Sequence, residues 1–234
     1  MLPPTAPRLH RPMCSTCLRP QSACLCHWVR PTAHAVEVLI LQHPLEVAQA
    51  KGSARLLHLS LQRSRLVTGE VFEASTLQAL LTAPFEPQSD GTQPRQTLLL
   101  YPDTPSESDL PLVSPPLLEA GYLEQTSGLR LVVLDGTWRK SRKMLYLNPL
   151  LQGLPRLALR DLPPSHYLIR KAHRPDQRST LEATCAALAQ LEGDTGQFGA
   201  LMAAFDGFVA QQSRQSHLIV EPRLRRAPAP TQTS

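Results

Sequence analysis

The sequence contains few charged residues and no long apolar run. Asp, Glu, Lys and Arg make up 18% of the 234 residues, against roughly 25% in typical soluble domains. No segment approaches the ~18 uninterrupted apolar residues of a membrane-spanning helix. The second absence argues against a membrane-spanning protein, and the length fits one folded core with extensions at its ends.

Common signatures of export and of catalysis are also missing. The first residues, MLPPTAPRLHRP, are partly basic but lack an apolar segment followed by a small-residue cleavage site, so we expect a cytoplasmic protein. There is no P-loop, no G-x-G-x-x-G fingerprint, no H-E-x-x-H and no nucleophile elbow. These absences disfavour the common nucleotide hydrolases, dehydrogenases and serine hydrolases.

Proline and basic residues are present in excess. Many of the 23 prolines lie in the first 31 and the last 13 residues, where we expect irregular structure. Lys and Arg number 24 against 19 Asp and Glu, which gives a net charge of +5. This charge permits a polyanionic partner but does not require one.

Alternating strand and helix patterns predict the fold. Residues 36–41, 97–101 and 129–134 are short runs rich in branched side chains, typical of strands covered on both faces. Apolar residues recur at helical spacing over 48–60, 74–81, 115–120, 179–191 and 198–212. The alternation predicts an α/β fold with a mainly parallel sheet. Residues 84–94 and 222–234 are expected to be loops.

Four cysteines form the pattern C-x2-C-x6-C-x-C: Cys14, Cys17, Cys24 and Cys26. Four thiolates this close can surround one tetrahedral ion, and C-x2-C is a frequent source of two zinc ligands. Unrelated reduced thiols, a redox pair and an iron–sulfur cluster are the alternatives. We expect a structural zinc ion, because four protein ligands leave no position for substrate. Cys185, among alanines, is expected to be a small buried apolar residue.

The third predicted strand is followed by the sequence LDGTWRKSRKM. Its candidate site residues are Asp135, Gly136, Thr137 and Trp138, followed by the cations Arg139, Lys140, Arg142 and Lys143. Ligands of parallel α/β folds bind at the carboxyl ends of the strands, and cations beside an aromatic ring suit a phosphate backbone. The alternative is that Asp135 caps the next helix, Trp138 packs in the core and the cations are simply solvated.

A second polar stretch precedes the helix predicted at residue 179. It carries the cations Arg170, Lys171, Arg174 and Arg178, with His173 among them. Ser179 and Glu182 form a capping box, and a helix N-terminus beside Thr180 suits a carboxylate or phosphate, although the cap itself needs no ligand. His43 and Glu46 lie where the first strand gives way to a helix, which also places them at the crevice edge.

In order and spacing, four motifs resemble the DTW-domain family over roughly residues 14–209. They are the cysteine pattern, H-P-x-E at residues 43–46, L-D-G-T-W at 134–138 and S-T-L-E-A at 179–183. The resemblance implies a tRNA-uridine aminocarboxypropyltransferase, which moves the 3-amino-3-carboxypropyl group of S-adenosylmethionine to N3 of a uridine in the tRNA variable loop and releases methylthioadenosine. It also implies a fold related to the SPOUT methyltransferases, whose knotted carboxyl half binds the cofactor.

For that reaction, we expect Asp135, with Thr137 beside it, to receive or orient the N3 proton, since Asp135 is the acid at a strand end. The residues expected to bind S-adenosylmethionine are Gly136, Trp138, Ser179, Thr180 and Glu182, and the eight cations of the two basic stretches are expected to bind tRNA. Residues 51–53 depart from the polar Asn-Thr-containing stretch of the family, although Arg55, Leu56 and Leu57 are retained.

The sequence therefore divides into four regions. They are an irregular tail (1–13), a zinc segment with the four clustered cysteines (14–31), the α/β catalytic domain (32–213) and a basic, proline-rich tail (214–234). A SPOUT-like RNA methyltransferase and a non-catalytic zinc-containing RNA-binding protein remain as rival functions. We infer no membrane association and no protein partner.

Overall fold

The structure is a computed structural model. It describes residues 12–50, 52–86, 94–102, 112–119, 121–123, 125–159 and 178–224, with side chains described as far as residue 214. No helix in these ranges is long and apolar enough to cross a membrane.

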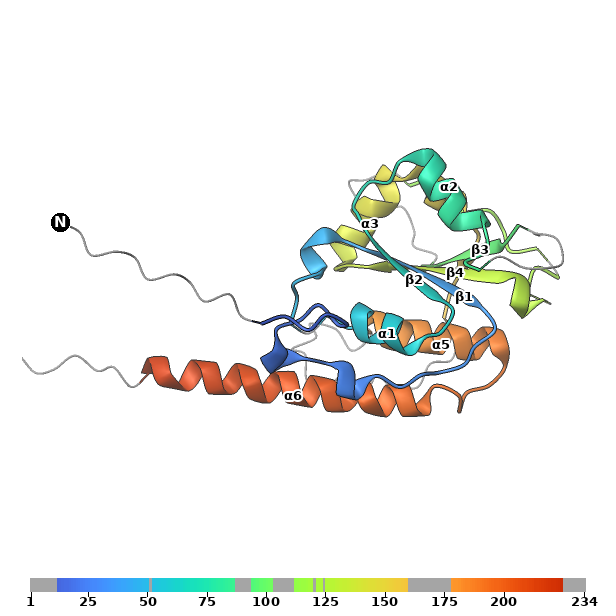
Figure 1. Cartoon of the computed structure of the whole chain (residues 1–234). Helices are drawn as coiled ribbons and strands as arrows, with labels where there is room; N and C mark the ends of the chain where they lie inside the picture. Colours follow the sequence, from blue (N-terminus) through green and yellow to red (C-terminus); the bar gives the residue numbers. More distant parts are fainter. Residues whose placement is uncertain are drawn as a thin grey trace, which may run out of the picture.

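A five-stranded parallel sheet forms the centre of the molecule (Figure 1). Its strands are β1 (Glu37–Gln42), β2 (Ser64–Thr68), β3 (Gln96–Leu100), β4 (Leu129–Asp135) and β5 (Arg156–Leu157). The strand order is β2-β1-β4-β3-β5, and every neighbouring pair is parallel. The predicted α/β fold with a parallel sheet is confirmed. The knotted carboxyl half stays a prediction, because residues 160–177 lie outside the described ranges.

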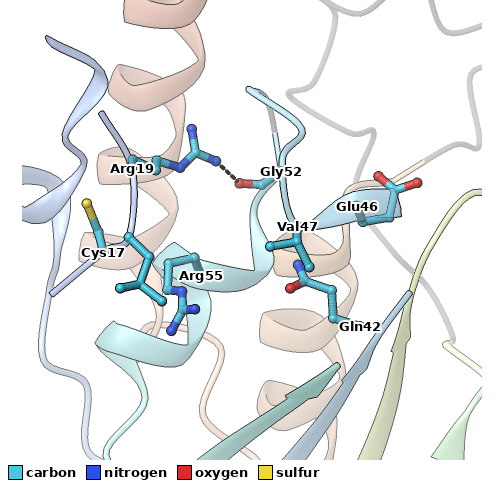
Figure 2. A pocket seen from close by; sticks show the side chains of 8 residues that line it. Cys17, Arg19, Gln42, Glu46, Val47, Gly52 and Arg55 are labelled. Carbon is cyan, nitrogen blue, oxygen red and sulfur yellow. Dashed lines mark hydrogen bonds between the residues drawn. The ribbon is translucent and has the colours of Figure 1, made fainter. Parts of the chain in front are cut away.

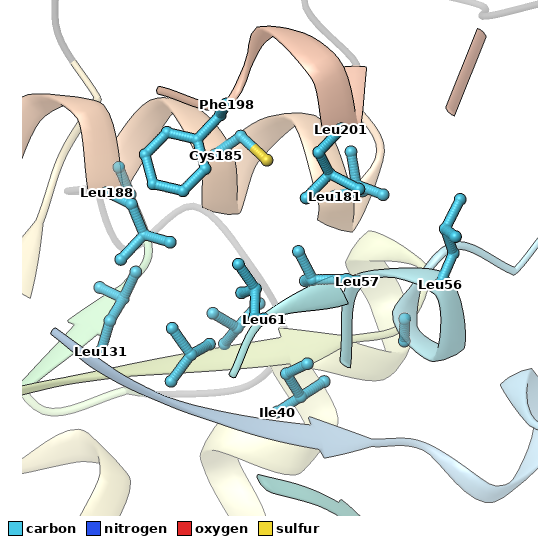
Figure 3. Packing of buried hydrophobic residues seen from close by; sticks show 14 of the residues in the cluster. Ile40, Leu56, Leu57, Leu61, Leu131, Leu181, Cys185, Leu188, Phe198 and Leu201 are labelled. Atoms are coloured by element: carbon cyan, nitrogen blue, oxygen red, sulfur yellow. The ribbon is translucent and has the colours of Figure 1, made fainter. Parts of the chain in front are cut away.

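Helices cover both faces of the sheet, which explains why β1 and β4 are buried at every position. One face carries α1 (Ala54–Ser60), α5 (Thr180–Glu192) and α6 (Gly199–Leu224), and the other carries α2 (Ala74–Thr82), α3 (Trp138–Leu147) and α4 (Pro149–Gln152). Figure 3 shows Leu57 of α1 and Leu188 of α5 above Ile40 and Leu131 of the sheet. Cys185 lies in this core, as expected, and its burial raises its pKa to about 12.

Several predicted boundaries were wrong for physical reasons. The helix expected from residue 48 begins at Ala54, because residues 44–46 form a separate 3-10 turn and the Gly52 N–H then donates to the carbonyl oxygen of Gln49 at 2.9 Å, which closes a further turn before the helix. A Cβ at Gly52 would lie 3.1 Å from the carbonyl oxygen of Gln49. Residues 115–119 form no helix, and Leu117 is 90% exposed because no core lies beneath it. The helix α6 continues to Leu224, through residues 222–224 that we expected to be loop.

The cysteine-rich segment is fixed against α6. It contains two 3-10 turns, Gln21–Ala23 and Cys26–Trp28. The indole N–H of Trp28 donates a hydrogen bond to Gln211 Oε1 at 2.6 Å. A Cβ on Gly207 would come within 2.3 Å of the Trp28 ring, so a glycine at this position makes room for the indole. The segment thus docks on the outer layer of the same domain.

A buried ion network closes the amino end of the sheet. Glu37 on β1 lies opposite Arg130 on β4, and its carboxylate accepts hydrogen bonds from Arg130 and from Arg95 Nη2, the latter at 2.9 Å. Burial opposes ionisation of Glu37, but the hydrogen bonds and charge of Arg130 outweigh it and lower the pKa of the carboxyl group. Arg130 also donates to the carbonyl oxygen of Leu80, which ties the sheet to α2.

Replacing Arg130 should strongly destabilise the protein. Its side chain is fully buried, so Arg130→Met leaves the Glu37 charge partly uncompensated, and we expect a loss of about 3–5 kcal/mol of unfolding free energy. Arg63→Met is the matched control, because the Arg63 side chain binds the same carboxylate but is 35% exposed, and it should cost less than about 1 kcal/mol. Urea denaturation followed by circular dichroism measures both. Equal losses in the two variants would contradict the buried pair's role.

Candidate active site

Polar side chains gather at the carboxyl edge of the sheet. The neighbouring strands β1 and β4 end in register, with Gln42 beside Asp135. The helix α3 begins just after β4, and the N-terminus of α5 reaches the same edge, where Thr180 contacts Asp135. Parallel α/β folds bind ligands at this edge. The motif predicted from the sequence therefore lies where a ligand site is expected.

Asp135 is held by two side chains from distant parts of the sequence. It is 6% exposed. Its Oδ2 accepts a hydrogen bond from Gln42 Nε2 at 2.9 Å, and its Oδ1 accepts one from Thr180 Oγ1 at 2.7 Å. Each carboxylate oxygen can accept more than one hydrogen bond. These two hydrogen bonds therefore orient the carboxylate.

Gln42 was not predicted as a site residue. It is the last residue of a continuously buried strand, where an amide side chain needs a partner. The signal in the sequence was a polar residue directly after the mainly apolar run of residues 36–41, and its partner became evident only from the register of β1 on β4.

The residues after Asp135 start the helix α3. Thr137 is the N-cap of α3, with its Oγ1 accepting from the Lys140 N–H at 3.4 Å, so Thr137 rather than Asp135 caps this helix. A Cβ on Gly136 would lie 3.2 Å from Lys140 Cβ, which explains the glycine. Trp138 is 50% exposed and stacks on the buried ring of Tyr101, with 5.1 Å between centroids. The alternative of a core tryptophan is wrong.

The capping box at α5 forms as the sequence predicts. Ser179 Oγ accepts from the Glu182 N–H at 3.1 Å, and Glu182 Oε2 accepts from the Ser179 N–H at 2.8 Å. Ser53 Oγ accepts from the Leu181 N–H at 3.3 Å, which adds α1's N-cap residue to this cluster. A role of Ser179 and Glu182 toward S-adenosylmethionine stays a prediction. Their cap positions Thr180 against Asp135.

Two cations of the basic run on α3 are held by glutamates. Lys140 Nζ lies 2.7 Å from Glu46 Oε1, and Lys143 Nζ lies 3.0 Å from Glu70 Oε1. The hydrogen bond from Lys143, and after it that from His43, lowers the pKa of Glu70. Because His43 Nδ1 accepts from a backbone N–H, its Nε2 carries the proton that Glu70 accepts. The predicted crevice-edge residues His43 and Glu46 thus support the basic helix.

The remaining predicted RNA-binding residues differ in their environments. Arg139 is exposed, and Arg142 and Arg178 are half-buried. Arg170, Lys171 and Arg174 lie outside the described residues. Among the described cations of the two predicted basic stretches, Arg139 and Lys143 are therefore the exposed ones.

A solvent-open hollow lies next to Gln42, the residue whose amide binds Asp135 (Figure 2). Its lining residues are Cys17, Leu18, Arg19, Gln42, Glu46, Val47, Gly52 and Arg55. Gln42 therefore links the hollow to the Asp135 carboxylate. Arg19 comes from the cysteine-rich segment and donates to the carbonyl oxygens of Ala50 and Gly52 at 2.6 and 2.9 Å, so this segment forms one wall of the hollow.

The four clustered cysteines fit a metal ion. Their sulfur atoms all lie within 4.8 Å of one another, with Cys14 and Cys26 3.6 Å apart and Cys17 and Cys24 3.8 Å apart. Tetrahedral zinc with bonds of about 2.3 Å places sulfur atoms about 3.8 Å apart. Backbone N–H groups of Cys17 and Thr16 lower the pKa of Cys14 to about 6, whereas burial, and then the neighbouring thiols, raise that of Cys26 to about 12. A bound cation would stabilise all four as thiolates.

We expect the purified protein to contain about one equivalent of zinc, because all four ligands come from the chain. Combined Cys14→Ser and Cys26→Ser substitutions should abolish binding, whereas Cys185→Ser, outside the cluster, should leave the metal content unchanged. Elemental analysis measures all three proteins. Less than about half an equivalent of any metal in the unsubstituted protein, or full content in the double variant, would overturn the assignment.

Comparison with known proteins agrees with the motifs. The DTW domain family model matches residues 11–213. The chain is 31% identical to tRNA-uridine aminocarboxypropyltransferase 2 of Drosophila melanogaster over 195 residues, which cover 80% of this chain and 69% of the relative. It is 28% identical to the Macaca fascicularis protein of the same name, covering 81% of this chain and 59% of that relative. No solved structure matches the chain significantly. Because the family model matches most of its length, the chain belongs to the DTW-domain family.

Proposed function

We propose that this chain is a tRNA-uridine aminocarboxypropyltransferase that uses S-adenosylmethionine as donor, acts on N3 of a uridine in the variable loop and works in the cytoplasm. The observation that carries the proposal is the buried, oriented Asp135 carboxylate at the carboxyl edge of the sheet. The names of the relatives support the reaction, and the DTW sequence around Asp135 supports its location.

The reaction is a displacement at the γ carbon of the donor's aminocarboxypropyl chain, which is bonded to the sulfonium sulfur. The uridine N3–H loses its proton, N3 forms a bond to that carbon, and the carbon–sulfur bond breaks. The electron pair of the broken bond stays on sulfur, so the sulfonium becomes the neutral thioether of methylthioadenosine. In-line alignment of N3, carbon and sulfur decides whether the aminocarboxypropyl group or the methyl group is transferred.

Asp135 supplies the basic oxygen in this scheme. Gln42 and Thr180 hold its two oxygens in place, so only a small rearrangement is needed when the N3–H approaches. Thr137 lies close to Asp135 in the sequence and caps the N-terminus of α3, the helix that carries Trp138 and the basic residues. The exposed face of Trp138 is available to stack on uracil or adenine, because Tyr101 covers only its other face.

The accessible cations of α3 suit the tRNA backbone. Arg139 follows the stacking tryptophan directly, and Lys143 lies one helical turn further on. We assign these residues and Arg178 to phosphate contacts, together with the basic residues of 170–174. Phosphate contacts position an RNA without reading its sequence, so selection of the uridine depends on the edge around Asp135.

Product analysis separates this function from its rivals. Protein incubated with unmodified tRNA and S-adenosylmethionine should release methylthioadenosine and leave an aminocarboxypropyl-uridine in the digested RNA. Release of S-adenosylhomocysteine with a methylated nucleoside would instead identify a methyltransferase. RNA binding without any product would identify a non-catalytic protein.

Asp135→Asn should slow single-turnover transfer by roughly 10²- to 10⁴-fold at saturating tRNA and donor, because it removes the basic oxygen and keeps the size of the side chain. Donor affinity, measured by calorimetry, should change little. Asp206→Asn, at an exposed position of α6, is the matched control. Near-normal transfer by Asp135→Asn would refute the assignment of Asp135 as the base.

Arg139→Ala should weaken tRNA binding and lower the slope of log affinity against log salt by about one, because one phosphate contact and its released counterion are lost. Arg214→Ala, which also removes an exposed arginine but on α6, should leave the slope unchanged. Filter binding across a salt series measures both variants. An unchanged slope in Arg139→Ala would show that this part of α3 is only a solvated face.

A further inference from the structure

The hollow next to Gln42 contains an arginine whose guanidinium makes no hydrogen bond or ion pair with the described residues. Arg55 lines the hollow and is half-buried. Arg19, in the same lining, differs because three backbone carbonyl oxygens, those of Gln49, Ala50 and Gly52, accept its N–H groups. Arg55 is therefore the cation in this lining that is available to a ligand.

The hollow also contains an acid and adjoins the reaction site. Glu46 lies across it from Arg55 (Figure 2), and its Oε1 is bound by Lys140 from α3. Gln42 lines the hollow and donates to the Asp135 carboxylate. A group bound by Arg55 in this hollow would therefore lie against the same Gln42 side chain that binds the Asp135 carboxylate.

We propose that Arg55 binds the carboxylate of the donor's amino-acid end and so selects a donor that carries this carboxylate. The inference rests on the proposed function. A guanidinium forms two parallel hydrogen bonds to a carboxylate, which gives both strength and orientation. Glu46 on the opposite side suits the neighbouring ammonium group, so the pair matches a zwitterionic amino acid.

An RNA phosphate is the other anion that a guanidinium would accept. The lining separates the two anions by its second group, because Lys140 binds only Oε1 of Glu46 and the other carboxylate oxygen can accept a hydrogen bond from an ammonium group. The zwitterionic end of the donor carries such an ammonium group, whereas a phosphate does not. The lining thus favours the donor over the nucleic acid.

Calorimetry with two ligands tests the proposal on the full chain. S-adenosylmethionine and decarboxylated S-adenosylmethionine differ only in the carboxylate. We expect the unsubstituted protein to bind the first about 10- to 100-fold more tightly, the effect of one charge-assisted pair. The substitution Arg55→Met should weaken binding of S-adenosylmethionine by the same factor. The variant should bind the two ligands equally, because the contact between Arg55 and the carboxylate is then absent. The control variant Arg214→Met should keep the preference for S-adenosylmethionine.

Three outcomes would overturn the role of Arg55. They are equal affinities for the two ligands in the unsubstituted protein, a preference retained in Arg55→Met, and weaker tRNA binding by Arg55→Met with an unchanged ligand preference. The first comparison needs no variant, so it decides even if Arg55→Met fails to fold. Absence of S-adenosylmethionine binding or of methylthioadenosine release by the unsubstituted protein would instead refute the proposed function.

Discussion

The parallel pairing of β1 with β4 is the constraint on which the rest of the structure depends. Its register places Glu37 opposite Arg130 at one end and Gln42 opposite Asp135 at the other. The residues between them are apolar and buried on both faces, so a shift of one residue would bury polar side chains without partners. At the amino end the charges neutralise each other within the protein. At the carboxyl end, hydrogen bonds from Gln42 and Thr180 orient the acid.

The cysteine-rich segment is part of the site as well as of the fold. Cys17 and Arg19 line the hollow next to Gln42, and Trp28 attaches the segment to α6 through Gln211. A metal ion in the cysteine cluster would therefore stabilise a wall of the hollow. The four-cysteine cluster and the edge that carries Asp135 thus lie in one domain, joined by the wall that Cys17 and Arg19 form.

Local patterns predicted the central elements better than the peripheral ones. The strands β1, β3 and β4 could be predicted because they are apolar on both faces. The edge strand β2 has no buried residue, and β5 is only two residues long, so neither leaves a distinct pattern in the sequence. Residues 115–119 have helical spacing but no core to pack against, and helical spacing without packing does not make a stable helix.

The sequence by itself determined what depends on near neighbours in the chain. The cysteine spacing predicted the cluster, and Ser179 with Glu182 predicted the capping box, because spacing alone brings these groups together. Only the tertiary structure decided the partners of Asp135, the pairing of Glu46 with Lys140 and the hollow around Arg55. These contacts join segments up to 94 residues apart, and strand register and helix packing, which no local pattern encodes, set their geometry.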